Sequence, residues 1–162
     1  MLVRNIFLST TAFILCSCSQ PVEEEKKTVV EKTKKSEKSL LEKLQAEYAV
    51  IDTIPYLEAY IERVIMVGSS SLGFKSGQMQ GGFTDEDTAK KIAHFVVELS
   101  GKECGDHQIA KKAQMYFTSN CGGCHGDDGK GQNGAFPDLT RDTLLGIQKR
   151  KEYLKFEIEK LK

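Results

Sequence analysis

Two cysteines and a histidine form the most reactive group of side chains in the sequence, within Cys121-Gly-Gly-Cys124-His125. Two thiols three positions apart can add to the two vinyl groups of one porphyrin, and the adjacent imidazole can then bind its iron. The spacing therefore predicts the attachment site of one covalently bound haem c. Cys121 and Cys124 are the predicted cofactor-binding residues, and His125 is the predicted iron ligand.

Other uses of a Cys-x-x-Cys pair need surroundings that this sequence does not offer. A thioredoxin-like redox pair belongs in a βαβ setting, and no strand pattern is visible. A zinc site needs a second pair of ligands at compatible spacing, and His94 and His107 do not form one. The haem interpretation is therefore favoured over both.

The N-terminus has the pattern of an export signal. Met1-Leu-Val-Arg4 is a short positive segment, and the apolar stretch from Ile6 to Leu15 is too short to cross a bilayer. The small residue Ser17 precedes Cys18, which favours cleavage there and lipidation of Cys18. We therefore expect a lipoprotein signal peptide over residues 1–17, with signal cleavage without a lipid as the alternative.

The signal and the haem motif predict the same compartment, because bacteria attach haem c outside the cytoplasmic membrane. We expect the protein at the periplasmic face of a bacterial membrane, held by its lipid anchor. Ser19, by analogy with enteric bacteria, leans toward the outer membrane. Cys104 remains unassigned, and a free thiol is favoured over an intermolecular disulfide or an iron ligand.

Length and composition restrict the remaining possibilities. The chain has 162 residues, enough for one small domain with tails. Lys plus Arg and Asp plus Glu both number 23, and no basic stripe interleaved with aromatic residues is present. Nucleic acid is therefore excluded as an expected partner.

The elements that must position the motif are predicted to be helices. Residues 18–39 contain almost nothing apolar and are expected to form a flexible charged tether. Apolar residues then recur at helical spacing from Leu40 to about Ile51, and again from Leu57 to Ile65. The Gly- and Ser-rich segment between Gly68 and Gly82 predicts a loop.

Three further helices follow in the pattern. One is expected to begin at a Thr84 cap and to stop at Gly101. The next is predicted from about Asp106 to Ser119, with Tyr116 on its buried side, and the last from about Arg141 onward. No strand pattern interrupts them, so the predicted class is all-α.

The flanks of the haem motif carry a family resemblance. The stretch Ala113-Gln-Met-Tyr-Phe117-Thr-Ser-Asn-Cys121 resembles the haem-binding half of class I cytochromes c, above all the haem domains of the dihaem subunit of cbb-type oxidases. This resemblance implies that Ala113 and Phe117 let two helices cross closely. It also matches Pro137-Asp-Leu139 to the family's Pro-x-Leu, whose proline carbonyl accepts a hydrogen bond from the proximal histidine.

The resemblance also implies an iron ligand upstream of the motif. Residues 53–101 resemble the C-terminal half of the same domain, with Gly77-Gln-Met79 at the methionine loop, so Met79 is the expected sixth ligand. The chain then has a circularly permuted cytochrome c domain with extra terminal helices, over residues 40–162. Its parts are a Met-loop half at 53–101, a CXXCH half at 106–140 and a C-terminal helix at 141–162.

Two alternatives to the permuted domain remain open. The chain could descend from a dihaem protein, so that two chains complete each other by exchange. The sixth iron position could instead belong to His107, to His94 or to water, or it could be empty.

The function implied by the resemblance is single-electron transfer rather than enzymatic catalysis. The expected partners are respiratory-chain proteins: a quinol-oxidising complex, an oxidase or a peroxidase. A haem subunit fixed within a membrane respiratory complex is the first alternative. A haem sensor with an open iron site is the second.

Overall fold

The computed structural model describes residues 22–69 and 77–162. Contacts divide the chain into residues 1–36 and residues 37–162. The described residues form helices, with an isolated antiparallel bridge between Ser69 and Met79, so the predicted all-α class is confirmed for them. The predicted signal peptide and Cys18 lie outside the described residues. None of the helices in the described ranges has the length and apolar character needed to span a bilayer.

Helix α1 (Val22–Val50) corrects the expectation of a flexible tether before residue 40. Residues 22–39 are helical, although the described side chains from 34 to 39 are exposed, as a segment without a core predicts. The physical reason lies in composition: Glu and Lys are good helix formers, and Glu31 and Lys35 stand at the favourable spacing of four. Polarity excluded these residues from a core, but it did not prevent a helix.

Helix α2 (Ile54–Val67) packs on helix α3 (Glu86–Leu99). Pro55 lies in the first turn of α2, where its missing N–H costs nothing. The cap of α3 is Asp85 rather than the expected Thr84, because the Asp85 carboxylate accepts a hydrogen bond from the Thr88 N–H at 2.9 Å. Gly101, with φ +77°, follows the end of α3 as predicted.

Helix α4 (His107–Asn120) packs along α3, the helix that precedes it in the chain. Ala113 and Phe117 are fully buried in this contact, and the rings of Phe95 and Phe117 lie 5.1 Å apart between centroids. The expected close crossing at a small residue is therefore present. Tyr116, expected on the buried side, is exposed instead.

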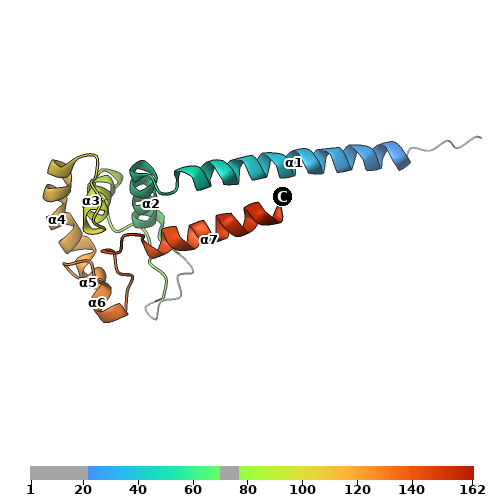
Figure 1. Cartoon of the computed structure of the whole chain (residues 1–162). Helices are drawn as coiled ribbons and strands as arrows, with labels where there is room; N and C mark the ends of the chain where they lie inside the picture. Colours follow the sequence, from blue (N-terminus) through green and yellow to red (C-terminus); the bar gives the residue numbers. More distant parts are fainter. Residues whose placement is uncertain (1–21, 70–76) are drawn as a thin grey trace, which may run out of the picture. The chain divides into compact units, whose positions relative to one another are not determined.

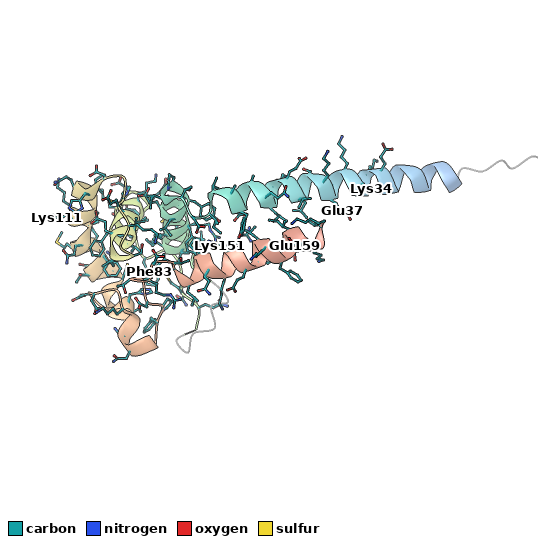
Figure 2. All side chains as sticks on the ribbon, in the orientation of Figure 1. Lys34, Glu37, Phe83, Lys111, Lys151 and Glu159 are labelled. Carbon is teal, nitrogen blue, oxygen red and sulfur yellow. The ribbon has the colours of Figure 1, made fainter. Side chains whose placement is uncertain are left out.

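The outer side of α4 carries charged residues. Figure 2 shows Lys111 pointing away from the neighbouring helices, and its side chain is exposed. Two helical turns follow, α5 (Gly122–His125) and α6 (Gly131–Gly134).

Helix α7 (Leu145–Lys160) begins later than the expected Arg141 and runs beside residues 37–50 of α1 (Figure 1). Leu44 from α1 and Leu154 from α7 belong to the same hydrophobic core. Arg150 donates two hydrogen bonds to the Glu47 carboxylate, at 2.8 and 2.7 Å, and the Tyr56 hydroxyl of α2 donates to the same group at 2.6 Å. We call Arg150, Glu47 and Tyr56 the three-helix clamp.

Candidate haem site

The haem motif lies on a single helical turn that continues α4. The Cys124 and His125 N–H groups both donate to the Cys121 carbonyl, at 3.1 and 2.9 Å. In a helix, positions three and four apart share a face. Cys121, Cys124 and His125 accordingly line one cavity.

The imidazole of His125 is oriented by the loop that follows it. His125 is buried, and its Nδ1 lies 3.1 Å from the Pro137 carbonyl oxygen. The tautomer that satisfies this carbonyl carries its proton on Nδ1, which leaves Nε2 as the free lone pair. Burial lowers the pKa of His125, against the smaller opposing effect of the Pro137 hydrogen bond, and so favours the neutral imidazole that a metal requires.

The position of Pro137 depends on a tight loop built on glycine. Gly131 has φ +74°, and a Cβ on it would lie 2.1 Å from the Phe136 carbonyl oxygen. The Phe136 N–H donates back to the Gly131 carbonyl at 3.0 Å, and the Leu139 N–H donates to the Gly129 carbonyl at 2.7 Å. Leu139 lines the same cavity as His125. The predicted Pro-x-Leu segment therefore lies beside the histidine.

Met79 reaches this cavity from the other half of the chain. It is half-buried and lines the cavity together with Cys121, Cys124 and His125. Its segment is attached to the end of α2 by backbone hydrogen bonds: the Ser69 N–H donates to the Met79 carbonyl at 2.9 Å, and the Gly82 N–H donates to the Ile65 carbonyl at 3.0 Å.

Close packing of backbone on backbone holds the Met79 segment in place. A Cβ on Gly81 would lie 2.4 Å from the Val67 carbonyl carbon, and a Cβ on Gly68 would lie 2.4 Å from the Met79 carbonyl oxygen. Both contacts are closer than any side chain allows. The loop therefore approaches α2 as tightly as it does because these two positions are glycine.

The cavity has a volume of about 320 Å³ and lies within residues 37–162. Most of its wall is apolar and comes from α2, α3, α4 and the loop after the haem motif, including Ile61, Val64, Ile92, Val96, Phe117 and Leu139. Two cysteines, a histidine and a methionine line a mostly apolar space. This set of donors fits a covalently bound haem c.

The other candidate ligands lie elsewhere. Neither His94 nor His107 is among the described residues that line the cavity. His94 Nδ1 lies 2.7 Å from a Glu58 carboxylate oxygen, and this contact joins α3 to α2. His107, the first residue of α4, contacts Glu98 of α3. Met115 is 67% exposed. These positions leave Met79 as the candidate that shares a cavity with His125.

Cys104 lies in the connection between α3 and α4. It is half-buried, its thiol lies 3.3 Å from a Glu98 oxygen, and burial raises its pKa. The environment disfavours a thiolate, in keeping with the expected free thiol.

Sequence reasoning missed part of the cavity wall. Tyr60, Phe83, Phe136 and the start of α7 at residues 144–146 also line it. Gly146 was the available signal, because an isolated glycine weakens a helix and therefore stands out within a helical pattern. The C-terminal helix was expected outside the family core, and its first turn contributes to the site.

Known proteins resemble parts of this chain. Residues 110–162 match the family model described as cytochrome c. The cbb3-type cytochrome c oxidase subunit CcoP of Helicobacter pylori is 37% identical over 100 residues, which cover 58% of this chain and 31% of that protein. The cbb3-type cytochrome c oxidase subunit FixP of Azorhizobium caulinodans is 39% identical over 51 residues, 32% of this chain and 17% of the relative.

The chain thus spans at most about a third of the length of these curated relatives. No solved structure is significantly similar to it.

Proposed function

Because residues 110–162 match the cytochrome c family model and part of the chain is similar to cbb3-type oxidase subunits, we propose that it carries single electrons through one covalently bound haem c. Cys121 and Cys124 form the thioether bonds, and His125 and Met79 are the iron ligands. The observation that carries this proposal is that all four side chains line one cavity.

The haem would supply the Fe(III)/Fe(II) couple, and the chain supplies its surroundings. The Pro137 carbonyl fixes the His125 ring so that Nε2 faces away from the loop. A thioether ligand raises the reduction potential relative to a second histidine. The mostly apolar wall would favour the less charged reduced state.

We further propose that the domain is circularly permuted, with its Met-loop half at 53–101 before its CXXCH half at 106–140. The support is structural adjacency: α3 ends the first half, α4 begins the second, and the two consecutive helices pack on each other. A short connection at 100–106 is sufficient because chain ends that meet in space can be joined without disturbing a core.

The proposed location is the periplasmic face of a bacterial membrane, with Cys18 lipidated after removal of residues 1–17. Two sequence features support it: the export signal and a haem motif of the kind matured outside the cytoplasmic membrane. The partners would then be respiratory-chain proteins.

The first experiment measures haem content and ligation. The full chain is expressed with the haem c attachment system, and mass spectrometry is expected to find one haem bound through Cys121 and Cys124. The ferric protein should show the weak far-red absorption band of methionine-ligated haem. Met79→Ala should abolish this band and keep the covalent haem, whereas the control Met115→Ala should keep both.

A band that survives in Met79→Ala would contradict Met79 ligation. A ferric wild-type protein without the band would favour the sensor alternative with an open iron site.

The alternative of a fixed subunit is supported by the relatives, which are oxidase subunits. Gentle detergent extraction of membranes separates the two roles. A mobile carrier should elute alone, whereas a fixed subunit should elute with an oxidase. Cys18→Ser should release a carrier into the soluble fraction and should leave a fixed subunit bound.

A further inference from the structure

Gly146, the second residue of α7, is in contact with a tyrosine from α2. A Cβ on Gly146 would lie 1.7 Å from the hydroxyl oxygen of Tyr60 and 2.7 Å from the ring carbon that bears it. Real Cβ atoms essentially never approach another atom so closely, so any side chain at position 146 must displace the phenol.

The backbone gives no other reason for glycine here. Gly146 is helical and is absent from the positive-φ positions of the described residues. Alanine is the better helix former in such a place. The Tyr60 ring is therefore the feature that requires a glycine at 146.

Both residues face the candidate haem cavity. Tyr60 and Gly146 line it together with Met79 and His125. Burial raises the pKa of Tyr60, so its hydroxyl stays protonated at neutral pH. Val64 lies four residues beyond Tyr60 on the same helix and also lines the cavity. The carbonyl of the next residue, Ile65, accepts the Gly82 N–H and so attaches the Met79 segment to α2.

We propose that Gly146 and Tyr60 are positioning residues of the haem site. The missing side chain at 146 lets the phenol pack between α2 and α7, and the phenol fixes the part of α2 to which the Met79 segment is attached. This inference rests on the proposed haem function. It makes α7 a structural part of the site, because moving its first turn moves Tyr60.

The test compares two glycine variants of the full haem-bearing chain. Gly146→Ala should retain covalent haem by mass spectrometry, but it should weaken the far-red band and shift the reduction potential. Gly105→Ala is the matched control, because Gly105 has no positive φ and a Cβ there meets nothing within 4 Å. The control should match wild type in both measurements.

A second substitution tests the contact itself. In the Gly146→Ala background, Tyr60→Phe removes the hydroxyl, which makes the closest contact, and keeps the ring in the cavity wall, so the band should return part of the way toward its wild-type intensity. Should Gly146→Ala fail to accumulate, recovery of folded holo-protein in the double variant supports the same contact.

The outcomes separate this inference from the function on which it rests. A haem-bearing wild type whose Gly146→Ala variant matches Gly105→Ala overturns the inference alone, as does a double variant no closer to wild type than Gly146→Ala. A wild-type chain without covalent haem overturns the proposed function, and the inference with it.

Discussion

At the scale of single residues, the chemistry of the site depends on which nitrogen His125 offers. The Pro137 carbonyl accepts the Nδ1 proton, so only Nε2 remains free as a ligand. Proline suits this role because its ring fixes φ and reduces the freedom of the acceptor. The loop around Gly131 therefore orients the histidine through the Pro137 carbonyl.

We predict that Gly131→Ala destabilises the protein and shifts the reduction potential, because its Cβ would collide with the Phe136 carbonyl next to Pro137. The matched control is Gly134→Ala, which has a similar φ of +82° and meets nothing within 4 Å. The control should cost only the left-handed backbone penalty, about 1 to 2 kcal/mol. Chemical unfolding measures the loss of stability, and redox titration measures the shift in potential. Equal losses and equal shifts in Gly131→Ala and Gly134→Ala would refute the predicted collision.

At this scale the sequence predicted the residues whose types carry chemistry. Cys121, Cys124 and His125 follow from their spacing, and Met79 and Pro137 follow from the family resemblance. Tyr60 was not assigned to the site because its residue type does not indicate a ligand, and Gly146, an isolated glycine in a helical pattern, did not reveal which residue it packs against. Their contact joins two distant parts of the chain, which periodicity within one helix cannot reveal.

At the scale of elements, the Met79 segment behaves as an extension of α2. Backbone hydrogen bonds attach it, and two glycines allow the contact. Gly81→Ala should therefore displace Met79 and abolish the far-red band while the thioether bonds remain. Gly105→Ala again serves as the control, since both glycines lack a positive φ and only one is crowded. An unchanged band in Gly81→Ala would show that the loop can relax around a methyl group.

The three-helix clamp has a predictable dependence on pH. The Arg150 hydrogen bond is the main cause that lowers the pKa of Glu47 below its ordinary value of 4.5, and burial opposes it. The unfolded chain thus binds the proton more readily, so the stabilisation is complete above about pH 4.5 and is lost as the pH falls through the lower folded pKa.

We therefore expect Glu47→Gln to lower the free energy of unfolding by about 1 kcal/mol at neutral pH, the upper range for partly exposed pairs. The difference from wild type should shrink below pH 4.5. Chemical unfolding at a series of pH values measures it. Glu159→Gln, in an exposed pair with Lys162, should leave stability unchanged. If the difference in unfolding free energy between Glu47→Gln and wild type stays constant as the pH falls below 4.5, the Glu47 carboxylate is not its source.

Helix positions were largely predictable, and the errors have local causes. Apolar spacing located α2, α3 and α4. The cap of α3 was misplaced by one residue because Thr84 and Asp85 are both good caps, and only geometry shows that Asp85 accepts the bond. The exposed part of α1 was mistaken for coil, because the absence of an apolar face argues against a core and not against a helix.

At the scale of the whole molecule, one chain brings together the four residues proposed to hold the haem. Both proposed ligands and both cysteines line a cavity within residues 37–162. Co-expression of Met79→Ala with a chain that carries Cys121→Ser and Cys124→Ser should therefore fail to restore the far-red band. Wild type co-expressed with the same Cys121→Ser, Cys124→Ser chain is the control. A restored band would demonstrate exchange between two chains.

The packing of α3 on α4 also has a kinetic consequence. The two helices are consecutive, so their interface closes a short loop, and the entropy of loop closure is small. Contacts between sequence neighbours form early and speed folding. The Phe95–Phe117 pair is therefore expected to assemble before Met79 and His125 come to line one cavity, giving the chain a preformed nucleus beside the proposed site of haem attachment.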